Sequence, residues 1–217
     1  QSFGQQSARV QLCERAEALA AGGDARQVAR DVQQLRNEWK ALDAQYAGVP
    51  RALWERFDKA CEKAYAPAAR HFAEVAAQRK ESRGKREEFI AAAAAQVPAL
   101  LGEPRDWRAV ERWLRETDRN WREGNLGSLE PKAWTRLDTQ LKAAVAPLRE
   151  ALGAAREEAR AVRLALIEEV KGITARAMER DAPSKVKAVQ AKWQEHAKTI
   201  SLPQRDERAL WEQFRTA

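Results

Sequence analysis

The sequence has little glycine or proline, which number only 10 and 8 among 217 residues. A β-sandwich or barrel needs many closely spaced turns, so these counts exclude an all-β fold. Cysteine is also scarce: Cys13 and Cys61 lie 48 positions apart, and no C-x-x-C motif is present. This usage is typical of a reduced cytosolic chain rather than of a disulfide scaffold.

Long hydrophobic runs and catalytic motifs are missing as well. No apolar run approaches the roughly 20 residues that span a bilayer, and residues 1–8 lack the apolar core of a signal peptide. The sequence contains no G-x-G-x-x-G, G-x-x-x-x-G-K-[ST], G-x-S-x-G or H-E-x-x-H segment. We expect a cytoplasmic, non-enzymatic protein without membrane segment, metal, cofactor or small-molecule substrate.

Five residue types dominate instead. Alanine (44), arginine (27), glutamate (23), leucine (18) and lysine (12) fill 124 of the 217 positions. Such a bias is typical of long helices or coiled coils. The eight tryptophans each bring a large apolar area, so we expect an ordered chain with a thin core.

A 77-residue repeat runs through the chain. Arg9, Arg86 and Arg163 stand 77 residues apart, and each begins a segment with matching apolar positions. The matched tryptophans are Trp39, Trp121 and Trp193 in a first motif, and Trp54, Trp134 and Trp211 in a second. The predicted copies are residues 9–85, 86–162 and 163–217. Because the third copy stops soon after its second motif, we expect the chain to be a fragment of a longer protein or to end within a helix.

Each copy is predicted to form three helices. Turn signals separate the first helix from the second and the second from the third, but none separates the third helix from the next copy. We therefore expect long helices that bridge adjacent copies, with a bend at Pro67 and at Pro147. The predicted fold is all-α: elongated tandem three-helix repeats that share long connecting helices and pack like a coiled coil.

The repeated tryptophans have two interpretations. Aromatic faces can stack on nucleobases, but Trp39, Trp121 and Trp193 lie in helical register with apolar neighbours. A core position is the favoured interpretation.

An arginine series marks the second helix of the middle copy. Its spacing of 3, 4, 3, 4, 3 places six arginines on one face of a helix, opposite the apolar residues. The six are Arg105, Arg108, Arg112, Arg115, Arg119 and Arg122. Over 17 steps this series extends about 25 Å, long enough to follow several phosphates of a nucleic acid.

A second basic series recurs with the 77-residue offset. It consists of Arg79, Arg83 and Arg86 in one copy, and of Arg156, Arg160 and Arg163 in the next. The guanidinium group suits bidentate contacts with phosphate or carboxylate. With a net charge of +7, the chain is a candidate for an anionic partner.

An ordinary solvated helix face would also explain the first series. Between residues 105 and 123, five acidic residues accompany the six arginines. Four pairs stand at i, i+4, the spacing of common helix-stabilising ion pairs. These pairs are Arg112 with Glu116, Glu111 with Arg115, Asp118 with Arg122, and Arg119 with Glu123.

The repeated tryptophans and the W-x-R-F/L-D segments at 54–58 and 134–138 resemble a bacterial family described as domain of unknown function 349. The resemblance implies a tandem helical architecture and a bacterial, cytoplasmic setting, but no activity. The third copy departs from the motif, because Arg215 stands where the others have Asp58 and Asp138.

The residues thus predict a binding module without catalysis. RNA is the favoured partner, on the basis of the arginine series. The alternative is a protein-binding or structural scaffold that contacts no nucleic acid, in which the charged faces serve solubility or protein contacts.

Overall fold

The structure is a computed structural model, and it describes residues 2–176, 178 and 180–217. Seven helices and no strand form within these residues. The helices are α1 (Ser2–Leu19), α2 (Ala25–Gln45), α3 (Arg51–Leu101), α4 (Trp107–Glu123), α5 (Pro131–Ala175), α6 (Ala182–Thr199) and α7 (Gln204–Thr216). The predicted all-α class is confirmed. None of the helices in the described residues has both the length and the apolar content needed to cross a membrane.

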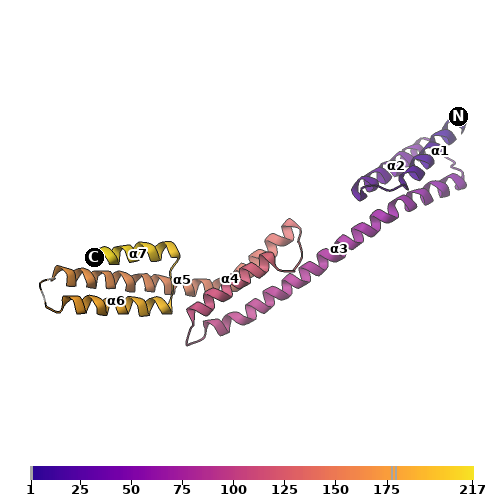
Figure 1. The fold of residues 1–217 in the computed structure, drawn as a ribbon. Coiled ribbons are helices and arrows are strands. Elements are labelled where there is room, and N and C mark those ends of the chain that lie inside the picture. Colours follow the sequence, from indigo (N-terminus) through magenta and orange to yellow (C-terminus); the bar gives the residue numbers. More distant parts are fainter. Residues whose placement is uncertain (1, 177, 179) are drawn as a thin grey trace. The chain divides into compact units, whose positions relative to one another are not determined.

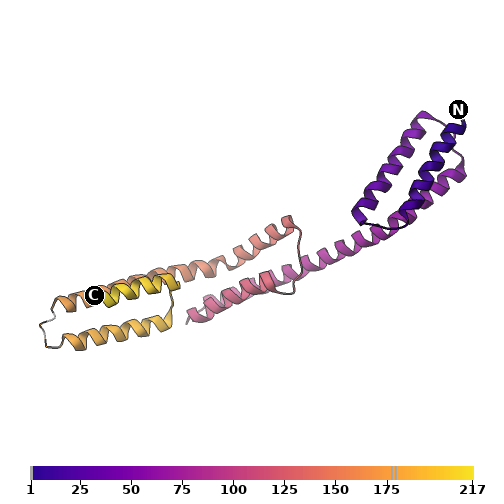
Figure 2. The ribbon, with the colours of Figure 1, turned by 45° about the horizontal axis from the view of Figure 1, so that its top comes forward.

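The chain divides into two compact units, Gln1–Glu81 and Ser82–Ala217. In the first unit, α1 and α2 pack with the N-terminal part of α3 around one core. The second unit holds two cores. One lies between the C-terminal part of α3, α4 and the N-terminal half of α5, and the other between the C-terminal half of α5, α6 and α7. Figures 1 and 2 both show α6 and α7 alongside this half of α5. The copy boundaries inferred from the repeat stay a prediction.

The long helices explain why the sequence lacks turn signals between successive third and first helices. Helix α3 has 51 residues and α5 has 45, and each contributes to two different cores. Both helices continue through their internal prolines, which are Pro67 and Pro98 in α3 and Pro147 in α5. A proline removes one backbone N–H but leaves the apolar face on either side intact, so packing along the helix sustains it.

Capping residues set the ends of the helix that carries the arginine series. Asp106 accepts hydrogen bonds from the backbone N–H groups of Arg108 and Ala109, at 3.1 and 3.2 Å, and so begins α4 at Trp107. After α4, Gly127 adopts a φ of +84° in the loop to α5. An added Cβ there would collide with the Ser82 hydroxyl, so both the backbone and the space favour glycine.

The first-motif tryptophans are core residues, as predicted. Trp39, Trp121 and Trp193 are 2%, 1% and 4% exposed. Trp121 lies 5.6 Å from the ring centroids of both Phe89 and Trp134, and its Nε1 donates to Asp138 Oδ1 at 3.0 Å. Each indole therefore fills its core, and the base-stacking interpretation of these three residues is wrong.

Candidate nucleic-acid interface

Helix α4 separates its apolar and basic residues onto opposite sides. Val110, Leu114 and Trp121 are buried in the core, which turns the residues half a turn away toward solvent. The exposed side carries five arginines, here called the arginine face. They are Arg108, Arg112, Arg115, Arg119 and Arg122. Their Cα atoms span about 21 Å along the helix, given a rise of 1.5 Å per residue.

Arg105, the sixth arginine of the predicted series, lies outside the helix. Because Asp106 is the N-cap, Arg105 precedes α4 and is not held in helical register with the others. Its Nε donates to the Leu101 carbonyl at 2.8 Å, and its guanidinium carbon lies 5.6 Å from the centroid of the Trp107 ring. Arg105 is therefore occupied by its own loop, and its predicted place on the helix is wrong.

Only one of the four predicted ion pairs forms among the described residues. Arg122 lies 3.4 Å from Asp118. Glu111 turns away from the arginine face: its Oε1 lies 3.0 Å from Arg156 Nη2, and the Ser201 hydroxyl donates to both of its oxygens.

Four members of the arginine face consequently lack a partner in the described part of the chain. No hydrogen bond or ion pair within the described residues involves Arg108, Arg112, Arg115 or Arg119. The solvated-face interpretation predicted four i, i+4 ion pairs, and three of them do not form within the described residues. These four guanidinium groups are free to contact a ligand.

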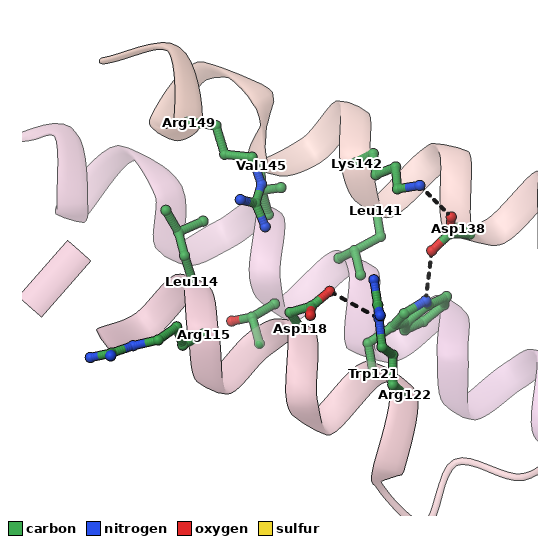
Figure 3. A pocket seen from close by; sticks show the side chains of 11 residues that line it. Leu114, Arg115, Asp118, Trp121, Arg122, Asp138, Leu141, Lys142, Val145 and Arg149 are labelled. Atoms are coloured by element: carbon green, nitrogen blue, oxygen red, sulfur yellow. Dashed lines mark hydrogen bonds and ion pairs between the residues drawn. The ribbon is translucent and has the colours of Figure 1, made fainter. Parts of the chain in front are cut away.

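A groove of about 600 Å³ runs between α4 and α5 beside the arginine face. Leu114, Leu141 and Val145 are apolar residues that line it, and charged side chains stand along its edges (Figure 3). At one end, Asp138 lies 2.9 Å from Lys142 and also accepts the hydrogen bond from Trp121. Asp118, on the opposite helix, is paired with Arg122. The two acids of the groove are thus neutralised by cations of the protein.

Two arginines of the groove have no such acid. Arg115 comes from α4 and Arg149 from α5, and neither makes a hydrogen bond or ion pair within the described residues. Figure 3 shows the Arg149 side chain descending from α5 beside Val145. The repeat did not indicate Arg149, because it stands outside both basic series; only its place next to the groove identifies it.

Two members of the second basic series are buried, in contrast to the ligand-binding role that we predicted for them. Arg86 and Arg163 are only 4% and 0% exposed. Arg86 donates to the carbonyls of Trp121 and Gly127, and Arg163 Nη2 donates to the Ile200 carbonyl at 2.8 Å. Burial lowers the pKa of both guanidinium groups, although an arginine stays charged in proteins. Neither residue can reach an external ligand.

The remaining members of this series differ in their surroundings. Arg156 pairs with Glu111, and Arg160 Nη2 lies 2.7 Å from Asp206 Oδ2. These contacts join α5 to α4 and to α7. Arg79 is exposed and Arg83 is half-buried. As a set, the series belongs more to helix packing than to an open surface.

Two of the arginines that begin the repeat copies, Arg9 and Arg86, lie against buried tryptophans, an arrangement that was not predicted. The guanidinium carbon of Arg9 lies 4.8 Å from the Trp39 centroid, and that of Arg86 lies 4.6 Å from the Trp121 centroid. Arg9 also binds Asp43 at 2.9 Å, near the end of α2. A signal was present: arginine recurs at one position of every copy among apolar residues.

The two cysteines of the chain lie in the core. Cys13 and Cys61 are fully buried, and burial raises the pKa of both thiols, which disfavours the reactive thiolate. No three histidine, cysteine, aspartate or glutamate side chains of the described residues gather where they could hold a metal ion. The arginine face and its groove are therefore the candidate site.

His196 provides a pH-dependent stability prediction. Burial, and then the positive charge of Arg163, lower the pKa of His196, against a smaller opposing effect of Glu207. The unfolded chain binds a proton near pH 6.5, while the folded chain resists it. The contribution of neutral His196 to the free energy of unfolding of residues 82–217 should therefore be complete above about pH 6.5. It should be lost as the pH falls toward the pKa of His196 in the folded chain.

Urea unfolding at about pH 7.5 and 5.5, followed by circular dichroism, measures this loss, because most carboxylates titrate lower. The control is His196→Leu, since Leu42 stands at the matched position of the first copy. This variant should lose less stability on acidification than the parent protein. Equal losses in both proteins would assign the effect to other groups.

Comparison with known proteins finds a family model that matches part of the chain. The model of the family described as Domain of Unknown Function (DUF349) matches residues 52–125. The matched segment includes most of α3, all of α4 and the arginine face. The resemblance drawn from the tryptophan motifs is confirmed for this segment. No curated protein and no solved structure matched the chain.

Proposed function

We propose that the chain is a non-catalytic helical module that binds an anionic macromolecule, with RNA as the favoured partner, through the arginine face of α4. One observation carries the proposal: four arginines exposed on one side of a single helix make no hydrogen bond or ion pair with the described residues. They are Arg108, Arg112, Arg115 and Arg119. Four adjacent cations repel one another, and an external polyanion would relieve that repulsion.

The spacing of these arginines fits a polyanion better than a single small anion. About 21 Å of helix separates the first and last arginine of the face, so one phosphate could not contact them all. A nucleic acid presents a phosphate every few ångströms along its length. Each contact would release condensed counterions, which makes the affinity strongly dependent on salt.

The expected result is a steep salt dependence of RNA binding. Four phosphate contacts predict a slope of about −3 to −4 in a plot of log affinity against log salt concentration. Fluorescence anisotropy with labelled RNA at several potassium chloride concentrations measures the slope. Reversal of the four free arginines (R108E, R112E, R115E and R119E) should weaken binding by more than about 100-fold, because four cations become repulsive anions.

A matched control changes the net charge by the same amount elsewhere in the same unit. Four exposed cations make no hydrogen bond or ion pair with the described residues and serve as this control. They are Lys132, Arg136, Arg205 and Arg208. Their reversal to glutamate should weaken binding far less. If both quadruple variants lose affinity equally, the binding reflects net charge rather than this face. A flat salt response would reject the proposal.

The scaffold alternative makes a different prediction. A protein partner should remain bound to the chain after nuclease treatment of a cell extract, whereas a complex bridged by RNA should dissociate. If binding of the partner survives both nuclease and the reversal of the arginine face, the module acts through another surface and without nucleic acid.

A further inference from the structure

We infer that the ligand of this site is double-stranded RNA, held by its sugar–phosphate backbone, and that Arg149 of α5 contributes to the site together with the four free arginines of α4. The inference rests on the proposed function, and it adds the form of RNA and a residue from a second helix. It follows from the side chains that the site has, from those it lacks, and from the geometry of the groove.

The site offers no aromatic surface on which bases could stack. Trp121 is buried, and Trp107, Trp113 and Trp134 are half-buried and pack against the core between α3, α4 and α5. The Trp113 indole is further held by a 2.7 Å hydrogen bond from its Nε1 to Gln96 Oε1. Proteins that bind single strands depend on stacking between bases and aromatic side chains. The arginine face lacks this source of affinity, which disfavours an unpaired strand.

The exposed side of α4 consists mainly of arginines, whose guanidinium groups suit bidentate contacts with phosphate. Asparagine and glutamine are the usual readers of adenine edges, and the exposed residues between 108 and 123 include one of them, Asn120, beside five arginines and two glutamates. Contacts to phosphates position a nucleic acid without selecting its sequence. Recognition of duplex RNA relies mostly on shape, phosphates and 2′-hydroxyl groups, so the composition of the site matches the duplex form.

Rigidity favours the duplex as well. The arginines project from one continuous helix whose core side is packed, so their Cα positions are fixed. The phosphates of a duplex are also fixed, whereas a single strand must lose conformational freedom to match the same positions. Two preorganised partners avoid much of this ordering cost.

The groove supplies cations from two helices. Arg115 lies on its α4 side and Arg149 on its α5 side, and packed helices have axes about 8–10 Å apart. The pair can therefore contact phosphates of two strands across one groove of the duplex. Asp118 and Asp138 also line the groove. Their carboxylates can accept hydrogen bonds from 2′-hydroxyl groups, which deoxyribose lacks.

The test compares three ligands of one sequence: an RNA duplex, one of its single strands, and the equivalent DNA duplex. A length of about 20 base pairs exceeds the roughly 16 spanned by a typical duplex-binding module. Anisotropy with the full chain at fixed salt should give at least about tenfold tighter binding of duplex RNA than of the single strand, equivalent to about 1.4 kcal/mol. The DNA duplex should bind more weakly than the RNA duplex.

Arg149→Glu and Arg136→Glu form a matched pair on α5. Arg149 lines the groove, while Arg136 is exposed, thirteen residues earlier and about 140° away around the helix. Arg149→Glu should weaken binding of duplex RNA by about tenfold, the usual effect of losing one charge-assisted contact. Arg136→Glu should change it by less than about twofold. Circular dichroism of both variants verifies that the helices are retained.

The outcomes separate this inference from the proposed function. Equal or tighter binding of the single strand, with the steep salt slope and the effect of the α4 quadruple variant intact, overturns the duplex assignment and leaves the proposed function standing. An unchanged affinity for Arg149→Glu overturns the role of α5. If the DNA duplex binds as tightly as the RNA duplex, the assignment to RNA is wrong. If none of the three ligands binds, the proposed function fails.

Discussion

Replacing Trp121 with alanine is expected to lower the free energy of unfolding of residues 82–217 by about 3–5 kcal/mol, the usual range for a buried large aromatic residue. Trp121 is only 1% exposed, and it packs against Phe89, Trp134 and the guanidinium group of Arg86. Truncation would leave a cavity in this core and would leave Asp138 without its hydrogen bond from the indole. Urea unfolding monitored by circular dichroism measures the change.

Trp211 provides the control, because it belongs to the same compact unit but is 37% exposed. Trp211→Ala removes the same side chain from a position where solvent already reaches the ring, so its effect should be clearly smaller. Similar losses for the two variants would contradict the assignment of Trp121 as the centre of its core.

The helical fold could be predicted because periodicity and turn signals act locally. The absence of a turn signal after residue 51 correctly indicated one long helix, which is α3. The detail of its packing face was ambiguous: Tyr65 and Ala64 both fit the apolar spacing, and the structure buries Ala64 and leaves Tyr65 40% exposed. The choice between these neighbouring positions depends on tertiary contacts in the core that α1, α2 and α3 share.

The exposed side of α4 could also be predicted, whereas the pairing of its charges could not. Arginines opposite Leu114 and Trp121 must face solvent once these residues are buried. Their ion pairs depend on distant segments: Glu111 binds Arg156 and Ser201, which lie 45 and 90 residues further along the chain. An i, i+4 rule cannot include such competitors. The free state of Arg115 is a consequence of this tertiary contact.

The burial of Arg86 and Arg163 was not predicted, because arginine is rarely buried without a partner. In this fold the partners are backbone carbonyls at the ends of helices. Arg86 binds the Trp121 carbonyl in the last turn of α4, and Arg163 binds that of Ile200, which is the C-cap of α6. Terminal carbonyls lack intrahelical donors and attract cations. The two matched arginines thus satisfy the end of the second helix in their copies.

This role leads to an unequal expected effect of two equivalent substitutions. Arg86→Met should lower the free energy of unfolding by about 3–5 kcal/mol, because it leaves the Trp121 and Gly127 carbonyls without their donor and removes a cation over two indole rings. All three guanidinium nitrogens of Arg86 are engaged.

Arg163→Met should cost less, below about 2 kcal/mol, although Arg163 is the more deeply buried residue. Its Nε and Nη1 are buried and have no hydrogen-bond partner in the described part of the chain, so the native side chain already bears a desolvation cost that methionine would remove. Against this gain stand the lost contacts with the Ile200 carbonyl and with Glu207. Urea unfolding of both variants in parallel measures the two losses of stability. A larger loss for Arg86→Met than for Arg163→Met would show that hydrogen bonds to carbonyls, rather than burial, determine how much each arginine stabilises the fold. An equal or larger loss for Arg163→Met would show that the ion pair with Glu207 outweighs the unpartnered donors.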